Sequence, residues 1–321
     1  MIVNLLEPVY DYDKFISDTR KLTQQYQGII KHVTIGRSHD NRDIVMLGLG
    51  IGSKFITCVG GVHGRETINP IVLMKIIEYY AELYTNYKRQ KQELFQQLSG
   101  FFTNLISEYE QMIYGSCIYE LLQTYTILFV PLLNPDGYMI SLLGYDSIRN
   151  EELRLEAISK DELHTEWKYN GRGIDINRNF PSRLWRPKGT QDHPASEHET
   201  RALIKVFHQY KSEGFLDFHS RGKSIYYYRS MMSDIYNERQ LRIANKLQEI
   251  TNYELVPPQD EVEAGDSGGN TVHYYSERFY KTALTIETVD DDADFPLDVN
   301  YRLTTFEELK LVIFKFGSLI I

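Results

Sequence analysis

The sequence has little cysteine and no long apolar run. Its two cysteines, Cys58 and Cys117, are too few for a disulfide framework or a four-cysteine zinc site, and each stands in a short apolar run that favours a buried free thiol. Apolar runs such as 127–133 are far shorter than the ~18–20 residues that cross a bilayer. Residues 1–13 lack the basic segment and apolar core of a signal peptide. These absences predict a soluble cytoplasmic protein with no membrane partner.

The sequence also lacks an excess of positive charge and any internal repeat. Lys and Arg total 35 and Asp and Glu total 44, which gives a net charge of −9 and argues against a nucleic-acid partner. With 42% hydrophobic and 25% charged residues, the composition is that of an ordinary globular protein. No low-complexity tract or Pro- or Gly/Ser-rich linker divides the 321 residues. A single domain over residues 1–321 is therefore favoured over two.

The hydrophobic pattern alternates between helical and strand-like segments. It predicts helices over 14–26, 71–84, 94–123, 198–210, 236–251 and 306–316, and strands over 33–36, 43–49, 55–59, 126–133, 214–218 and 282–287. Asn134-Pro135-Asp136-Gly137 predicts a turn. Apolar strands that alternate with helices are typical of an α/β fold whose largely parallel sheet is covered on both faces. In such sheets, ligand sites lie beyond the carboxyl ends of the strands.

Two strand ends carry candidate metal ligands. His63-Gly64-Arg65-Glu66 follows the first of these strands, and a His and a Glu three residues apart at the start of a helix can bind one ion. His219, which ends another strand, would complete a two-histidine, one-glutamate set with an open position, as in catalytic zinc sites. The alternatives are a surface His–Glu pair at a helix start and a structural histidine. The sequence contains no His-Glu-x-x-His motif.

Glu287 ends a third apolar strand. Burial there would raise the pKa of its carboxyl toward the range of a general base. The alternative, which the sequence leaves equally open, is an edge-strand carboxylate that reaches water. The run 290–292, three aspartates, is expected to be a solvated loop.

The segment from Lys168 to Lys188 is basic. It holds six Lys and Arg residues and one acid, Asp175, so its local charge is +5 within a chain of −9. Such a segment suits an anionic small substrate, because an arginine can bind a carboxylate through two parallel hydrogen bonds. The alternative is a basic surface loop that pairs with acidic neighbours.

Together these segments resemble the zinc carboxypeptidase family typified by carboxypeptidase A. The resemblance rests on an ordered set of motifs, namely His63-Gly64-Arg65-Glu66, Asn134-Pro135-Asp136-Gly137-Tyr138, Gly173-Ile174-Asp175-Ile176-Asn177-Arg178-Asn179-Phe180, His219-Ser220 and Thr285-Ile286-Glu287. It implies a single α/β domain whose mixed, mostly parallel sheet of about eight strands lies between helices.

The same resemblance assigns roles to residues. It implies that His63, Glu66 and His219 bind one Zn²⁺ per chain, and that Glu287 is the base that deprotonates zinc-bound water and later protonates the leaving amine. It further implies that Asn177 and Arg178 hold the carboxylate of the released residue, while Asp175 orients His63.

Three positions depart from the family pattern. The oxyanion-stabilising arginine is matched by Lys168, with Arg172 or Arg65 as substitutes. The mobile tyrosine is matched by Ala264, ahead of Ser267-Gly268-Gly269, so a phenol is absent or comes from elsewhere, for example Tyr274. Thr271 stands near the specificity-pocket position and predicts a polar pocket.

These departures, with Arg221 beside a candidate ligand, resemble the bacterial γ-D-glutamyl-L-diamino acid peptidases and murein peptide amidases. That branch implies a small anionic peptide substrate such as a murein tripeptide, with Arg221 either contacting substrate or pairing at the surface. The alternatives are an ordinary metallocarboxypeptidase that releases C-terminal L-residues, a hydrolase of N-acyl groups or protein side chains, and a non-catalytic relative that binds peptide or metal.

Overall fold

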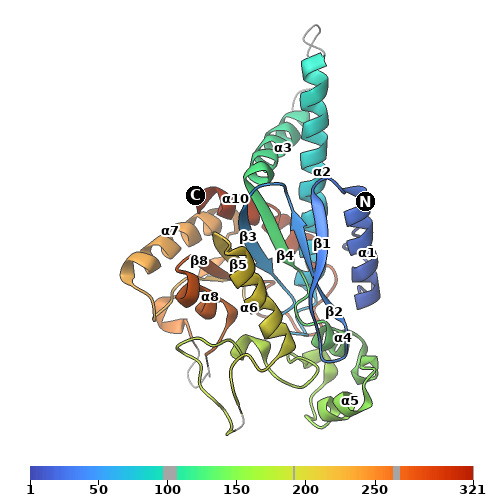
Figure 1. Cartoon of the computed structure of the whole chain (residues 1–321), viewed down its shortest axis with the longest axis vertical. Coiled ribbons are helices and arrows are strands. Elements are labelled where there is room, and N and C mark those ends of the chain that lie inside the picture. Colours follow the sequence, from blue (N-terminus) through green and yellow to red (C-terminus); the bar gives the residue numbers. More distant parts are fainter. Residues whose placement is uncertain (97–106, 191, 263–267, 321) are drawn as a thin grey trace.

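The computed structural model describes residues 1–96, 107–190, 192–262 and 268–320 (Figure 1). Its strands are β1 (Ile30–Arg37), β2 (Asp43–Leu49), β3 (Lys54–Val59), β4 (Tyr125–Val130), β5 (Gly214–Ser220), β6 (Ser224–Tyr226), β7 (Glu254–Leu255) and β8 (Thr282–Thr288). They form one eight-stranded sheet in the order β1-β2-β4-β3-β5-β8-β6-β7. The predicted α/β fold with a mixed sheet is confirmed.

The middle of the sheet is parallel. The neighbours β4, β3, β5 and β8 run in the same direction, whereas β2 pairs with both β1 and β4 in the antiparallel sense, as β6 does with β8. The carboxyl ends of the four parallel strands therefore meet at one edge. In the register of β5 with β8, His219 lies opposite Glu287, so both side chains project from the same face at that edge.

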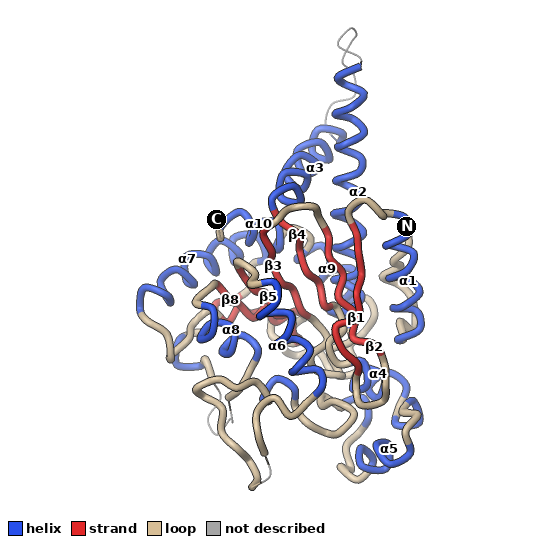
Figure 2. The backbone as a smooth tube through the Cα atoms, in the orientation of Figure 1, coloured by secondary structure: helices blue, strands red, loops and turns tan. Residues whose placement is uncertain are grey.

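Helices cover both faces of the sheet (Figure 2). The helices are α1 (Tyr12–Gln25), α2 (Ile68–Gln96), α3 (Ser107–Thr124), α4 (Pro135–Leu143), α5 (Glu151–Ile158), α6 (His198–Tyr210), α7 (Asp234–Thr251), α8 (Thr271–Phe279), α9 (Tyr301–Leu309) and α10 (Val312–Leu319). Residues of α6 and α8 share a buried cluster with Ile44, Met46 and Phe215. Residues of α1, α2, α7, α9 and α10 share the larger cluster with Val45, Leu47 and Leu216. Alternate residues of each strand thus enter opposite core layers, as a sheet buried on both faces requires.

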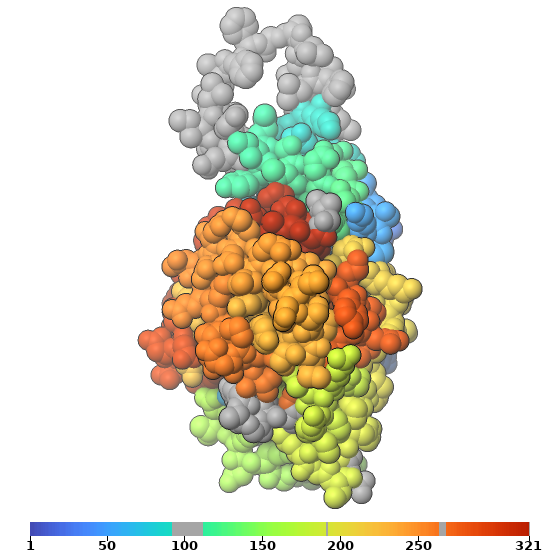
Figure 3. Space-filling view, turned by 90° about the vertical axis from the view of Figure 1, so that its left-hand side faces the viewer, coloured from blue at the N-terminus to red at the C-terminus, as the bar shows by residue number. Residues whose placement is uncertain are grey.

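The helices α2 and α3 extend beyond the sheet as a protrusion (Figures 1 and 3). The sequence predicted that the first helix ends at Tyr84 and a second begins at Leu94, but α2 continues through both residues to Gln96. Beyond Tyr84 the sequence becomes polar because the helix leaves the core, so its apolar periodicity is lost there. Residues 97–106, which the second predicted helix includes, lie outside the described part of the chain.

Two other predicted boundaries are wrong. The turn predicted at Asn134-Pro135-Asp136-Gly137 begins α4, because the Asn134 side chain accepts the Gly137 N–H and Pro135 takes the first helical position. The single helix predicted over 306–316 is divided between α9 and α10, with the break at Lys310 and Leu311. Of the two free cysteines, Cys58 is buried and Cys117 is partly exposed. No described helix is both long and apolar enough to span a membrane.

Candidate metal centre and its cavity

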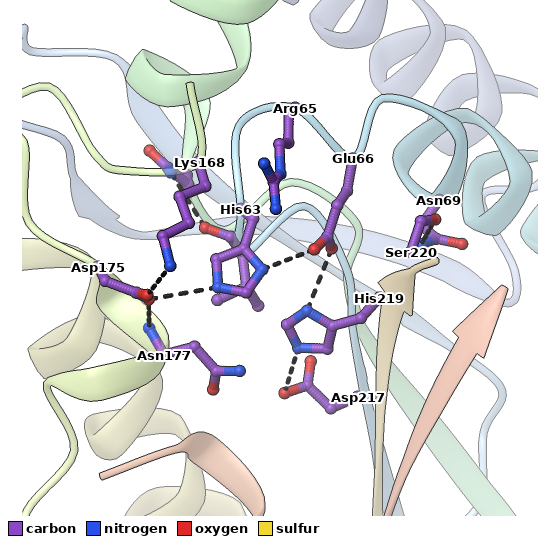
Figure 4. A network of polar contacts seen from close by, with 12 residues as sticks. His63, Arg65, Glu66, Asn69, Lys168, Asp175, Asn177, Asp217, His219 and Ser220 are labelled. Atoms are coloured by element: carbon purple, nitrogen blue, oxygen red, sulfur yellow. Dashed lines mark hydrogen bonds and ion pairs between the residues drawn. The ribbon is translucent and has the colours of Figure 1, made fainter. Parts of the chain in front are cut away.

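His63 and Glu66 lie between β3 and α2, and His219 lies near the end of β5 (Figure 4). Because β3 and β5 are parallel neighbours, both segments reach the same edge of the sheet. Gly64 allows the chain to pass close to its neighbour, since a Cβ atom there would collide with the carbonyl oxygen of Gly137. The local sequence thus brings three potential ligands to one point.

The donor atoms of these residues face one another. Nδ1 of His63 lies 2.6 Å from Oε1 of Glu66, and Nδ1 of His219 lies 3.1 Å from Oε2 of the same carboxylate. One donor atom from each residue lies within 4.8 Å of the others. Two imidazoles and a carboxylate arranged in this way match a three-ligand zinc site.

The electrostatics of the three residues also fit a dication. Burial alone would raise the pKa of Glu66, but the neighbouring His63 and His219 lower it to about 2. Burial opposes the charged form of His219, yet Asp217 and Glu66 raise its pKa well above the usual value. This cluster therefore holds protons between its donors. A bound dication would replace those protons, so the residues present fit a metal ion.

Asp175 supports His63 from behind. Its Oδ1 lies 3.2 Å from Nε2 of His63 and accepts the backbone N–H of Asn177 at 2.9 Å, while Nζ of Lys168 lies 3.1 Å from Oδ2 (Figure 4). Burial opposes ionisation, but His63, Arg178 and Lys168 hold the pKa of Asp175 far below its usual range. With Nε2 occupied, the imidazole presents Nδ1 toward Glu66 and His219.

Glu287 lines the same cavity from an inner strand. β8 has β5 on one side and β6 on the other, so the alternative of an edge-strand carboxylate does not hold. Burial raises the pKa of Glu287 to about 8, and the nearby Glu66 acts in the same direction against the histidines. A carboxyl with this pKa can hold or release a proton near neutral pH.

A cavity of about 390 Å³ joins these groups. Among the sequence candidates it is lined by His63, Arg65, Glu66, Lys168, Asp175, Asn177, Arg178, Arg221 and Glu287, whereas the buried His219 does not line it. Sequence reasoning did not single out several other lining residues, among them Arg229, Glu261, His273 and Phe295. They come from loops, from the residues that follow the short strand β6, and from helix α8, which the sequence analysis did not predict.

Thr271 does not line the cavity and differs from its expected place in the specificity pocket. Its hydroxyl donates to Asp217, and its backbone N–H donates to Oδ1 of Asn177 at 3.2 Å. As the first residue of α8 it is buried behind the wall, where it positions Asn177 and Asp217. Asn270 and Val272 on either side of it reach the cavity instead.

Two residues that the sequence suggested as substitutes, Arg172 for the family's arginine and Tyr274 for its tyrosine, also lie outside the cavity. Nη1 of Arg172 pairs with Glu197 at 3.2 Å outside the cavity, which leaves Lys168 and Arg65 as cations near the metal ligands. The hydroxyl of Tyr274 lies 2.8 Å from Nε2 of His208, among aromatic residues of the core. Ala264 and Ser267 lie outside the described residues.

The basic segment is only partly a cavity wall. Of its six cations, Lys168 and Arg178 line the cavity. Arg183 and Arg186 donate to backbone carbonyls on exposed surface. Its local charge of +5 therefore overstated the positive charge that a bound substrate meets.

A second group of possible ligands, His39, Glu197 and Glu199, also has donor atoms within 4.8 Å of one another. Here Glu197 already accepts hydrogen bonds from Ser196 (2.7 Å), Asn170 (2.7 Å) and Arg172 (3.2 Å) and contacts His39 at 2.9 Å. These bonds tie the β1–β2 hairpin to the start of α6, which is a structural role.

Known proteins resemble this chain in sequence and in fold. The sequence profile of the family described as zinc carboxypeptidase matches residues 16–308. The uncharacterised protein YqgT of Bacillus subtilis is 26% identical over 237 residues, which cover 69% of this chain and 56% of YqgT. The inactive metallocarboxypeptidase ECM14 of Paracoccidioides brasiliensis is 25% identical over 206 residues, 58% of this chain and 27% of ECM14. This chain thus spans about half of YqgT and a quarter of ECM14.

Among solved structures, bovine thrombin-activatable fibrinolysis inhibitor aligns with a TM-score of 0.70 at 16% identity, over 97% of both chains. At this identity the likeness concerns the fold. The two proteins therefore share the overall fold.

Proposed function

This chain belongs to the zinc carboxypeptidase family, and we propose that it is a zinc-dependent peptidase that hydrolyses one amide bond of a small anionic peptide. The observation that carries the proposal is that His63 and Glu66 line one cavity with Glu287 and Arg178, while the buried His219 completes the ligand set through its contact with Glu66. Metal ligands, a proton-transferring carboxyl and a carboxylate anchor are the parts that such a hydrolysis needs.

His63, Glu66 and His219 would hold Zn²⁺, which when bound polarises the scissile carbonyl and activates water for attack. Asp175 fixes the ring of His63 so that Nδ1 faces the other two ligands. Lys168, 34% exposed and already paired with Asp175, supplies positive charge beside the cavity in place of the family arginine.

Glu287 moves the proton. As a carboxylate it takes a proton from the attacking water, and as a carboxylic acid it gives that proton to the departing amine. Its partly buried position favours both states near neutral pH, because burial raises its pKa while the histidines lower it. The proton that Glu287 takes from water is therefore the proton that it gives to the amine.

Asn177 and Arg178 bind the carboxylate of the released residue. Thr271 fixes Asn177 by donating its backbone N–H to Oδ1, which leaves the amide NH₂ available as a donor. Nη1 of Arg178 donates to the backbone carbonyl of Asn177 at 2.8 Å, so the two side chains are held together. A planar guanidinium next to an amide donor suits a carboxylate.

The wall next to this anchor favours a released residue with an amino group on its side chain. Glu261 lines the cavity, and although burial opposes its ionisation, hydrogen bonds from His273 and Ser230 lower the pKa of its carboxyl. Its Oε1 lies 3.0 Å from Nε2 of His273, whose own pKa burial lowers, so the pair keeps a net negative charge. Arg229 lines the same cavity and interacts electrostatically with both groups, so this wall carries charges of both signs. Such a wall suits a side chain that bears both an amino group and a carboxylate, which supports meso-diaminopimelate as the released residue and hence the γ-D-glutamyl–diamino acid bond of murein peptides.

The second candidate is a metallocarboxypeptidase that releases C-terminal L-residues from ordinary peptides. Asn177 and Arg178 support this candidate as strongly as the first, because every C-terminal residue carries the carboxylate that they would bind. A non-catalytic binding protein is the candidate of another class, since the ECM14 relative is named inactive. The presence of Glu287 beside a complete ligand set argues against that reading.

Hydrolysis of a substrate panel by the zinc-loaded protein separates these candidates. We expect L-Ala-γ-D-Glu-meso-diaminopimelate to be cleaved with free diaminopimelate as a product, and more efficiently than α-linked peptides that end in Lys or Phe. Faster cleavage of the α-linked peptides would establish the second candidate. Failure to cleave any member, with zinc bound, would favour the non-catalytic one.

A further inference from the structure

Two arginines share one aromatic ring in the cavity wall. The guanidinium carbon of Arg65 lies 4.5 Å from the ring centroid of Phe295, and that of Arg221 lies 5.6 Å from the same centroid. All three residues line the cavity that holds the candidate metal ligands. They come from three separate segments, the β3–α2 connection, the end of β5 and the loop after β8.

The positive charge of this pair is only partly compensated. Nη1 of Arg65 lies 3.0 Å from Oε2 of Glu166, whose side chain is 43% exposed, and Nε of Arg65 has no hydrogen-bond partner among the described residues. Arg221 has no hydrogen bond or ion pair in the described ranges, and its guanidinium lies over the ring. Asp291 lines the same cavity, but no ion pair within 4.0 Å joins it to either arginine. The ring of Phe295 therefore holds two guanidinium groups in place without neutralising them.

Arg65 lies away from Asn177 of the carboxylate anchor, and Arg221 shares the ring of Phe295 with Arg65. In Figure 4, Arg65 and Asn177 project on opposite sides of His63. If Asn177 and Arg178 hold the released residue, as the proposed function has it, then the part of the substrate beyond the scissile carbonyl extends toward Phe295. A group bound between Arg65 and Arg221 would therefore belong to the acyl side of the scissile bond.

We propose that Arg65 and Arg221 bind a free carboxylate on the acyl-side residue, so that the enzyme selects substrates by a second negative charge. This inference rests on the proposed function and names the chemical class of the acyl residue. A γ-linked glutamyl residue meets the requirement, because its α-carboxylate stays free near the scissile carbonyl. A guanidinium can donate two parallel hydrogen bonds to that group, and Arg221 has no described partner to give up first.

A matched pair of substrates tests the proposal directly. One is L-Ala-γ-D-Glu-meso-diaminopimelate, and the other is the same peptide with the glutamyl α-carboxylate converted to a carboxamide. We expect kcat/KM of the zinc-loaded protein to be roughly 10- to 100-fold higher for the carboxylate form, the range for a charged hydrogen bond. Equal values would overturn this inference and leave the proposed function standing. Cleavage of neither peptide would overturn both.

The variant Arg221→Gln tests whether Arg221 is responsible for the preference for the carboxylate peptide. We expect it to lower kcat/KM for the carboxylate peptide to nearly that of the carboxamide peptide, while the value for the carboxamide peptide changes by less than about twofold. Arg239→Gln is the control, because Arg239 also lies over a ring, that of Tyr236 at 5.0 Å, but outside the cavity. It should leave both values unchanged.

Zinc content and thermal midpoint of each variant show whether the site is intact. An equal loss for both peptides in Arg221→Gln, with zinc retained, would mean that Arg221 acts structurally and would contradict the proposal. If this variant does not fold, the ratio of the two peptides in the unmodified protein still decides the question. The variant Arg221→Lys then serves as the comparison. We expect its ratio of kcat/KM between the two peptides to be intermediate, because lysine keeps the positive charge but cannot donate two parallel hydrogen bonds.

Discussion

Replacing Asp175 by asparagine removes one negative charge from behind His63 while keeping the shape of the side chain. The carboxylate contacts Nε2 of His63 at 3.2 Å, the N–H of Asn177 at 2.9 Å and Nζ of Lys168 at 3.1 Å. An asparagine oxygen can still accept one or two of these hydrogen bonds. It cannot supply the charge that makes the opposite nitrogen of the His63 ring a stronger ligand.

The expected cost follows from that role. Loss of an outer-sphere carboxylate typically weakens metal binding by about 10- to 100-fold. At about 1.4 kcal/mol per factor of ten, this is a loss of about 1.4 to 2.7 kcal/mol in zinc binding. The loss of Lys168 as a partner should add little to the change in folding stability, because its side chain is one-third exposed.

Competition with a chelator of known affinity, at fixed pH and ionic strength, measures the change in zinc Kd. Glu197→Gln is the matched control, since Glu197 is also a buried carboxylate that contacts a histidine, His39 at 2.9 Å, but outside the cavity. This control should lower the thermal midpoint and leave zinc Kd unchanged. An unaltered Kd in Asp175→Asn, or an equal rise in the control, would refute the reasoning.

Three further changes test separate groups. Glu287→Gln should keep its zinc and lose about 10²- to 10⁴-fold in kcat, the share of a general base, whereas a near-normal kcat would show that the proton moves elsewhere. Arg178→Ala should weaken substrates with a free terminal carboxylate by roughly 10- to 100-fold, and an equal loss on amidated substrates would contradict carboxylate binding. Burial raises the pKa of Glu199 from 4.5 to about 7, so the folded state binds more protons than the unfolded state between these values and loses stability as pH rises. Between pH 5 and 8, the free energy of unfolding measured in urea should therefore fall by up to about 3 kcal/mol less in Glu199→Gln than in the unmodified protein. An unchanged pH dependence would disprove the raised pKa.

The sequence predicted that the candidate metal ligands lie close together because they are tied to strand ends. His219 and Glu287 each lie near the end of a largely apolar strand, and in a parallel sheet such ends must meet at one edge. The pairing of His219 with Glu287 in the β5–β8 register realises that expectation directly. The role of Asp175 was inferred from the family motif alone. Its contact with His63 depends on the path of a loop, which hydrophobic periodicity does not predict.

Other features depend on contacts that sequence spacing does not contain. Arg172 stands in the basic segment like Lys168, yet its partner is Glu197, 25 residues later and outside the cavity. Thr271 falls next to cavity residues in sequence, but as the first residue of α8 it turns its hydroxyl to Asp217. Phe295 lies in a loop, so its position between Arg65 and Arg221 follows from tertiary packing alone.

Polar helices and helix starts explain the boundary errors. The outer part of α2 has no core to face, so its helical period disappears although the helix continues. Asn134-Pro135-Asp136-Gly137 has the composition of a turn, but the same residues cap and begin a helix when apolar residues follow. Local composition is ambiguous in both cases, and the packing environment decides the outcome.

The metal dependence of activity is the most direct test of the whole account. Metal analysis of the purified protein should find about one zinc per chain, the content of one three-ligand site, and its removal by a chelator should abolish peptide hydrolysis until zinc is restored. His219→Gln should lower both zinc content and activity. A metal-free protein that cleaves peptides at the full rate would contradict the central claim.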